Sequence, residues 1–297
     1  MSRPLVPPVV AAVDRSPQAR PTARAAAREA VCRHTDLHLV HVEGPVRPGL
    51  LPSGREGLHE HRHRASEQLL AELASSLSGL LPPGAIGTEA VAGRPAEVLV
   101  ERSADAALLV LGGRPEEGLG GLRLGSTASA VVAHARSPVL VLPDGPNAVL
   151  GMASSVVAGV AGDPTDAEVL AVAFEEAAAR GTDLTVVHAW IDPVLEPSWK
   201  SIGPLIDWDG VRDEEQRLLA EVLAGWQEKW PDVAVRPVLV REKRARALIG
   251  ATTAAELLVI GHRHRRLAAL GSTTREVLHR AGCPVIVVPL GTGTEVR

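Results

Sequence analysis

Short apolar runs alternate with longer amphipathic stretches along the first half of the chain. Val9–Val13 is an apolar run suited to a strand that is buried on both faces, and an Ala-rich helix is expected over residues 18–34. Further strands are expected at Leu37–Val42, Ile86–Val91, Ala107–Leu111 and Val139–Leu142. Helices are expected over residues 59–81, with Leu69, Leu70, Leu73, Leu77 and Leu80 at helical spacing, and at Ala96–Ala104 and Thr127–Ala135. This alternation predicts a parallel sheet with helices on both faces.

The second half of the chain repeats the first. Val9-Val-Ala-Ala-Val-Asp14 matches Val156-Val-Ala-Gly-Val-Ala161, and Thr35-Asp-Leu-His-Leu-Val-His41 matches Thr182-Asp-Leu-Thr-Val-Val-His188, both displaced by 147 residues. The displacement is 149 in the second helix and 146 at the Gly-Ser-Thr sequences that begin at Gly125 and Gly271. The repeat predicts two tandem α/β domains, residues 1–146 and 147–297, each a doubly wound, Rossmann-like parallel sheet of about five strands.

Composition excludes several classes of function. The net charge of −4 and the pI of 6.3 argue against a nucleic-acid partner, because neutralising phosphates requires a basic excess. The chain begins without an apolar signal sequence, and no apolar run reaches the roughly 20 residues that would span a membrane. Its two cysteines, Cys32 and Cys283, show no metal-binding or redox spacing. We therefore expect a cytoplasmic protein with no membrane partner.

Two segments of the first half follow strands and carry candidate binding chemistry. Asp14 comes directly after the first strand, and a glycine-rich segment from Gly112 to Thr127 joins the fourth strand to the fourth helix. Ligands of open parallel sheets bind beyond the carboxyl ends of the strands. The free N–H groups and dipole of the helix that opens at Gly125-Ser126-Thr127 favour a phosphate there. The alternative is that Ser126 only caps this helix.

At these residues the chain resembles the universal stress protein family. That family has an aspartate after the first strand, a Gly-x-Pro before the third helix (here Gly93-Arg-Pro95), a Gly-x2-Gly-x9-Gly-Ser/Thr loop and a terminal Pro-Val strand (here Pro138-Val139). The resemblance implies the strand order 3-2-1-4-5, pairing of the two halves through Val139–Leu142 and Val285–Val288, and bound ATP in many members. It implies that Asp14 accepts from the adenine amino group and that Val42 offers main-chain contacts to the base. It also implies that phosphates bind at Gly112, Gly125, Ser126 and Thr127.

The chain departs from the family pattern at several positions. Pro115 stands at the second glycine of the loop, where it removes an N–H donor, and Glu116 and Glu117 add negative charge after it. In the second half Ala161 replaces the aspartate and His264 replaces the second glycine.

The second loop is also shorter, and the Gly-x-Pro is missing from the second half. Only nine residues separate Gly261 from Gly271, against twelve between Gly112 and Gly125, and Glu242 and Arg244 occupy the Gly-x-Pro positions. We therefore expect ATP to bind at most once per chain, in the first domain, against a buried Asp14 carboxylate.

Other clusters each have a structural and a functional interpretation. His59 and His63 lie one helical turn apart, either as a metal-chelating pair or as part of a charged helix face. The basic run from His262 to Arg266 is either a solvated loop or an anion site. Trp226 and Trp230 continue the spacing of Leu218 and Val222, which indicates a core or interface role rather than a platform for base stacking.

No set of catalytic residues stands out, since Ser126 has no His–Asp partner nearby in the sequence. The favoured hypothesis is an ATP-binding, non-catalytic stress-response protein whose second domain is largely structural. The alternatives are an interaction scaffold that binds no nucleotide and a slow ATP hydrolase, for which Asp14 is the one visible base. Whether the chain forms a homodimer is left open.

Overall fold

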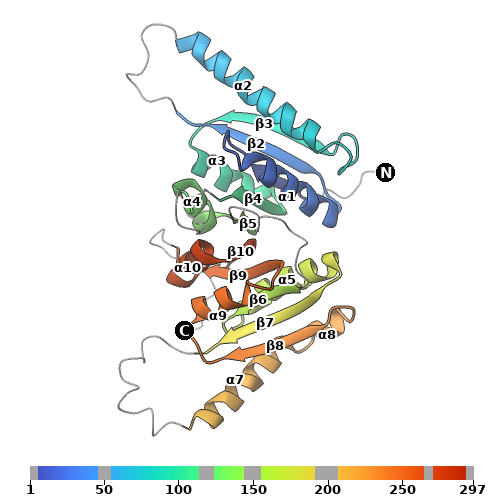
Figure 1. The fold of residues 1–297 in the computed structure, drawn as a ribbon, viewed down its shortest axis with the longest axis vertical. Helices are drawn as coiled ribbons and strands as arrows, with labels where there is room; N and C mark the ends of the chain where they lie inside the picture. The colour runs from blue at the N-terminus through green and yellow to red at the C-terminus, as the bar shows by residue number, and fades with distance from the viewer. Residues whose placement is uncertain are drawn as a thin grey trace. The chain divides into compact units, whose positions relative to one another are not determined.

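The computed structural model describes residues 6–45, 55–113, 124–143, 155–190, 207–263 and 270–291. These residues form two compact units, one holding the first five strands and the other the last five (Figure 1). Among the helices described, none is both long enough and apolar enough to cross a lipid bilayer.

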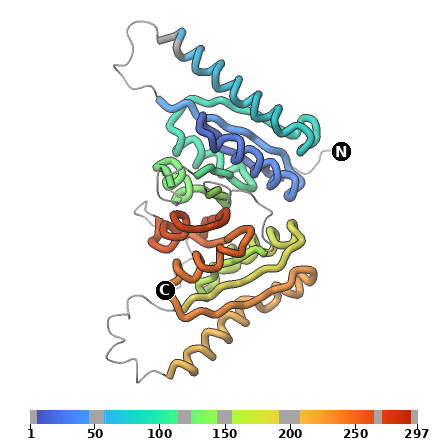
Figure 2. Tube along the Cα trace, viewed as in Figure 1, coloured from blue at the N-terminus to red at the C-terminus, as the bar shows by residue number. Residues whose placement is uncertain are grey.

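Unit 1 is a doubly wound, three-layer α/β/α domain. Its elements are β1 (Val9–Ala12), α1 (Ala19–Cys32), β2 (Leu37–Glu43), α2 (Arg55–Ser76), β3 (Ile86–Ala92), α3 (Pro95–Arg102), the 3-10 turn η1 (Ser103–Asp105), β4 (Leu108–Gly112), α4 (Ser126–His134) and β5 (Val139–Leu142). The strands are parallel and lie in the order β3-β2-β1-β4-β5, the 3-2-1-4-5 order that was expected. Helix α1 contacts α2, and α3 contacts α4, so each pair of helices belongs to one layer (Figure 2).

Unit 2 repeats this topology. Its elements are β6 (Ser155–Val160), α5 (Asp166–Arg180), β7 (Asp183–Ala189), α7 (Trp208–Leu223), α8 (Trp226–Lys229), β8 (Val235–Val240), α9 (Arg244–Ala251), β9 (Leu257–Arg263), α10 (Ser272–Arg280) and β10 (Val285–Leu290). The parallel order is β8-β7-β6-β9-β10, which is again 3-2-1-4-5 within the unit. The expected fold class is confirmed in both units.

The two cores are filled by different side chains. In unit 1 the small alanines of α1, among them Ala23, Ala26 and Ala27, are fully buried, so that this helix packs closely on β1 and β4. In unit 2 the core contains the fully buried Phe174, whose ring stacks on Trp226 with centroids 5.3 Å apart. Aromatic packing of this kind adds to the energy of apolar burial.

The cysteines occupy different environments. Cys283, just before β10, is 3% exposed. Burial raises the pKa of its thiol to about 12, against a smaller opposing effect of a hydrogen bond to the backbone of Leu258. Cys32, at the end of α1, is half-buried.

Two helix ends differ from the sequence-based expectation. The helix expected over residues 59–81 begins earlier, at Arg55, and ends at Ser76. Gly79 adopts the left-handed region at φ 90°, and prolines follow at 82 and 83, so the helix cannot continue. Leu80, expected on the apolar face of this helix, therefore lies beyond its end and is 41% exposed.

The second difference concerns the tryptophan series of unit 2. Helix α7 ends at Leu223, and Gly225 at φ 79° separates it from the short helix that starts at Trp226. Trp226 and Trp230 therefore do not extend the apolar stripe of α7. Both still pack on Phe174, as expected for core residues.

Candidate functional site

Unit 1 has a cavity of about 290 Å³ at the carboxyl ends of β1 and β4. These two strands are neighbours in the sheet, and the order of the strands reverses between them, which is where open α/β sheets bind ligands. All six residues singled out from the sequence line it: Asp14, Val42, Gly112, Gly125, Ser126 and Thr127. Apolar side chains, including Val40, Leu99 and Leu111, form much of the remaining wall. The structure thus brings the six residues together, while their binding roles stay predictions.

Asp14 lies at the mouth of this cavity. Its Oδ1 accepts a hydrogen bond of 2.9 Å from the N–H of Ser16, which fixes the carboxylate at the start of the loop between β1 and α1. The expectation of a buried carboxylate is wrong, because Asp14 follows the end of β1 and is exposed. A carboxylate has several acceptor positions, so the bond to Ser16 leaves capacity for a ligand donor.

His41 holds the same loop from the neighbouring strand, and sequence reasoning assigned it no role. It is 8% exposed, and its Nδ1 lies 2.8 Å from the carbonyl oxygen of Val13. A carbonyl oxygen only accepts, so Nδ1 carries the proton and donates it. His188, which matches His41 in the repeat, has its Nδ1 3.3 Å from the carbonyl oxygen of Val160. The repeated histidine was the signal in the sequence that could have revealed this contact.

Gly112 is required by the packing of α1. A Cβ at this position would lie 2.6 Å from Oγ1 of Thr22 and 3.3 Å from Cβ of Gln18. The Thr22 hydroxyl cannot easily move away, because it donates a 2.7 Å hydrogen bond to the carbonyl oxygen of Gln18. The glycine therefore allows the first turn of α1 to pack against the end of β4, and this packing shapes one side of the cavity.

The N-terminus of α4 provides backbone donors to the cavity. Gly125 is the N-cap, and no side chain caps the helix, so the alternative that Ser126 serves as the cap is wrong. The first intrahelical backbone bond runs from the N–H of Ser129 to the oxygen of Gly125. The N–H groups of Ser126, Thr127 and Ala128 consequently have no partner within the helix. All three residues line the cavity, whereas Pro115, Glu116 and Glu117 lie outside the described residues.

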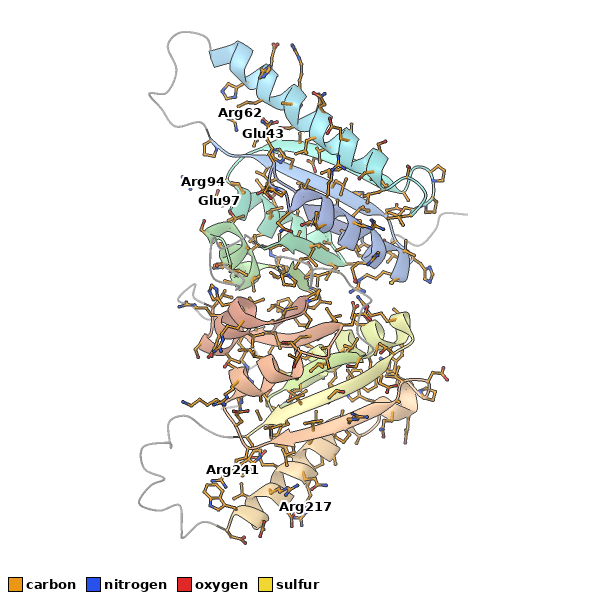
Figure 3. The ribbon with its side chains drawn as sticks, viewed as in Figure 1. Glu43, Arg62, Arg94, Glu97, Arg217 and Arg241 are labelled. Atoms are coloured by element: carbon orange, nitrogen blue, oxygen red, sulfur yellow. The ribbon has the colours of Figure 1, made fainter. Side chains whose placement is uncertain are left out.

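A charged cluster lies at the end of β2, near the same edge of the sheet. Glu43 is close to Arg62 of α2 (Figure 3), and Nδ1 of His63 lies 3.1 Å from its Oε1. Burial raises the pKa of Glu43, but hydrogen bonds from Ser66 and His63, with the charges of His63 and Arg62, lower it overall. His63 thus belongs to a polar helix face. Among the described residues no group of three potential ligands could hold a metal ion.

In unit 2 the N–H groups of the corresponding loop donate to a carboxylate of the same unit, and we call this arrangement a closed loop. Ala161 replaces Asp14, but Asp166 stands where unit 1 has Ala19. The Asp166 carboxylate is 3% exposed and accepts hydrogen bonds from the N–H groups of Ala161, Gly162 and Asp163 at 2.9, 2.7 and 2.9 Å. Three backbone donors at the end of β6 are therefore satisfied from within the chain.

An ion pair ties this loop to the end of β9. Arg263, the last residue of that strand, pairs with Oδ2 of Asp163 and lies 3.4 Å from Oγ1 of Thr165. Burial raises the pKa of Asp163, but hydrogen bonds from Thr165 and the nearby Arg263 lower it overall. By the repeat, Asp163 and Thr165 correspond to Ser16 and Gln18, which line the cavity of unit 1.

The basic run at the end of β9 was expected to be either a solvated loop or an anion site. His262 instead belongs to β9 and is 4% exposed, and Arg263 is held by the acidic loop. Residues 264–266 of this run lie outside the described residues.

Comparison with known proteins identifies the family of this chain. The sequence pattern of the universal stress protein family matches residues 6–143 and again residues 152–289. The chain belongs to the universal stress protein family. Each of the two matches spans all five strands of one unit, so the chain carries two universal stress protein domains in tandem.

Two relatives match this chain over nearly their whole length. A universal stress protein of Mycobacterium tuberculosis is 35% identical over 293 residues, which cover 94% of this chain and 95% of that protein. One from Mycolicibacterium smegmatis is 32% identical over 292 residues, covering 94% of this chain and 96% of its own. A solved universal stress protein from Archaeoglobus fulgidus matches with a TM-score of 0.68 at 16% identity, covering 95% of this chain and 98% of that one. That structural likeness supports the fold.

Proposed function

We propose that this chain is a cytoplasmic, non-catalytic stress-response protein whose unit 1 binds one adenine nucleotide, ATP, and whose unit 2 binds none. The observation that carries the proposal is the cavity of unit 1. It joins the Asp14 carboxylate, the main chain at Val42 and the uncapped N-terminus of α4 within one space. This set offers an acceptor for an amino group and donors for phosphate oxygens.

Each part of a nucleotide has a counterpart in this cavity. The base would lie on aliphatic walls such as Val40 and Leu111, since the first half of the chain has no Phe, Tyr or Trp ring that could stack on it. Asp14 would accept from the exocyclic amine. The N–H groups of Ser126 and Thr127 and the positive end of the α4 dipole would stabilise the phosphates. The hydroxyls of the same two residues add further donors.

One feature favours the alternative, an interaction scaffold that binds no nucleotide. Pro115, Glu116 and Glu117 lie in the loop that would surround the phosphates, and they remove a donor and add two negative charges. The two functions differ in a simple measurement. Mass spectrometry of small molecules released from the purified protein detects adenine nucleotide only if the first function holds.

The direct test is calorimetry with ATP on the parent and on Asp14→Ala. A charge-assisted hydrogen bond to the base contributes roughly 1.5–3 kcal/mol, so the variant should bind ATP about 10- to 100-fold more weakly. The matched control is Asp36→Ala, because Asp36 is an exposed aspartate of unit 1 outside the cavity. Equal affinities of parent and Asp14→Ala would remove Asp14 from the site. No binding to the parent would favour the scaffold.

A further inference from the structure

Unit 2 has a cavity of its own, separate from the position that corresponds to the nucleotide site. It measures about 300 Å³ and lies between the loop that follows β6, the first turn of α5 and the helices α7 and α8. Its lining residues are Gly162, Asp163, Pro164, Ala167, Leu218, Glu221, Val222 and Trp226. The cavity of unit 1 lies on the other side of its loop, toward β4 and α4.

The charge of this cavity is negative. Asp163 and Glu221 are its two charged lining residues, and both are acidic. Arg263 neutralises Asp163 from the end of β9, and it is not part of the lining. Glu221 is exposed on α7 and, within the described part of the chain, forms no ion pair. Glu221 therefore supplies the net negative charge, and it would attract a cation.

The walls are apolar and one of them is held rigidly. Leu218 and Val222 contribute aliphatic surface from α7, and Trp226 contributes an indole. The indole stacks on the fully buried ring of Phe174 with an interplanar angle of 11°, which fixes its orientation. The Nζ atom of Lys229 lies 5.4 Å from the centroid of the same indole. Phe174 and Lys229 thus already engage this ring, so the indole offers the cavity apolar surface rather than a free face for a cation.

Unit 1 does not reproduce this chemistry at the matching positions. By the repeat, Arg15 replaces Gly162, Arg20 replaces Ala167, and Leu77 replaces Trp226. The Arg15 guanidinium reaches across to α2, where it lies 3.3 Å from the carbonyl oxygen of Arg62 and 3.4 Å from Oγ of Ser66. Unit 1 keeps a carboxylate at the matching position, Glu72, but its two arginines would repel a cation and it has no indole there, so the full combination occurs in unit 2.

We propose that the cavity of unit 2 binds an organic cation of the alkylammonium class, with its chain against Leu218, Val222 and Trp226 and its ammonium group at Glu221. The apolar body contributes through burial, and the ammonium group contributes through the Glu221 carboxylate. A neutral or anionic molecule of the same shape lacks the second contribution. This site is independent of nucleotide binding by unit 1.

The test uses hexylammonium as the probe and the full-length protein. Calorimetry should show saturable binding of hexylammonium at millimolar concentrations, with hexanol weaker and hexanoate without binding. Glu221→Gln keeps the shape of the side chain and removes its charge, and it should weaken the binding about fivefold. Glu214→Gln is the matched control, because Glu214 is an exposed carboxylate of the same helix outside the lining, and it should leave the affinity unchanged.

A second readout places the probe at the indole. Hexylammonium should shift the Trp226 indole N–H signal in a ¹H–¹⁵N spectrum, and Trp226→Leu, which installs the residue found in unit 1, should abolish the binding. Three results would each overturn the proposal. They are hexanol binding as tightly as hexylammonium, Glu221→Gln binding as tightly as the parent, and the absence of saturable binding to the parent.

Discussion

The segments that follow the first strand of each unit align without a gap in the repeat, and they differ in where they carry a carboxylate. In unit 1 the carboxylate is at Asp14, exposed at the mouth of a cavity, and the position five residues later is Ala19. In unit 2 the first position is Ala161 and the later one is Asp166, which is buried and accepts from three backbone N–H groups. The same functional group thus lines a cavity in one position and accepts hydrogen bonds from its own loop in the other.

This difference shows that two units of one fold can satisfy the backbone donors of the same loop in different ways. Backbone donors that would otherwise need a ligand or water are satisfied in unit 2 by Asp166, and the Asp163–Arg263 pair fastens the same loop to β9. These donors of unit 2 therefore need no ligand. Substitutions at these positions should therefore affect the stability of unit 2 and the ligand affinity of unit 1 separately.

The largest effect is expected for Asp166→Ala. Removal of this buried carboxylate leaves three N–H groups without their acceptor, which should lower the free energy of unfolding of unit 2 by about 3 kcal/mol. All five tryptophans lie in unit 2, so urea denaturation followed by tryptophan fluorescence reports on this unit. Asp14→Ala is the control, and it should leave the midpoint of that transition unchanged. An unchanged midpoint for Asp166→Ala would contradict the closed-loop interpretation.

The next effect concerns Gly162, whose place in unit 1 is taken by Arg15. It adopts φ 83°, and a Cβ there would lie 2.6 Å from Cδ2 of Leu218. Gly162→Ala should lower the free energy of unfolding of unit 2 by about 2 kcal/mol.

The matched control for this variant is Gly225→Ala in the same unit. Gly225 has φ 79° and open space around its Cα, so only the backbone strain of about 1 kcal/mol is expected. The same fluorescence measurement compares the two. If both variants unfold at the same urea concentration, the contact with Leu218 does not contribute to the free energy of unfolding.

A carboxylate introduced into unit 1 should accept hydrogen bonds from the N–H groups of its own loop, as Asp166 does in unit 2. Ala19 lines the cavity at the start of α1, so Ala19→Asp places an acceptor where Asp166 stands in unit 2. We expect ATP affinity to fall at least about tenfold, with the thermal midpoint of unit 1 kept or raised. Calorimetry and circular dichroism measure the two quantities. Ala19→Asn keeps the size without the charge and should bind ATP better than Ala19→Asp; equal losses would assign the effect to size alone.

The smallest effect is the pH dependence contributed by Asp163. Its pKa is lowered in the folded unit from the ordinary value of 3.8, so the folded chain holds this proton more weakly than the unfolded chain does. The stabilisation is therefore fully present above pH 3.8 and is lost as the pH falls through the lower pKa of the folded unit. Because the pair is partly exposed, the loss should stay below about 1 kcal/mol.

Urea midpoints of parent and Asp163→Asn, measured between pH 7 and pH 2.5, test this contribution. The parent should be the more stable protein near neutrality, and the difference should shrink toward the acidic end of the series. A constant difference across the whole series would show that Asp163 makes no ionic contribution.

Much of the fold followed from the sequence because buried parallel strands are short apolar runs, and the repeat showed each of them twice. Asp14 and the segment from Gly112 to Thr127 could be found because they lie at the carboxyl ends of strands that share one edge, whereas Val42 was implied only by the family resemblance. The end of α2 was misplaced, since Leu77 and Leu80 have the same helical spacing and the left-handed Gly79 between them has no hydrophobic signal. Pairing of the two terminal strands stays a prediction.

The features of unit 2 could not be predicted for a different reason. Asp166 reads as an ordinary acidic residue at a helix start, and only the three-dimensional turn shows that its side chain reaches back to its own loop. The partners Asp163 and Arg263 are 100 residues apart in the chain. The second cavity depends on the break at Gly225, which brings Trp226 beside α7 and which no periodicity indicates.

The burial of Cys283 has a consequence for how a stress protein of this kind responds to oxidants. Oxidation of a cysteine proceeds through its thiolate, and a thiol whose pKa is raised to about 12 is almost entirely protonated in a neutral cell. About one molecule in 100,000 would carry the thiolate at pH 7, and the sulfur is shielded by the core as well. We therefore expect peroxide to oxidise the half-buried Cys32 of the native chain before Cys283.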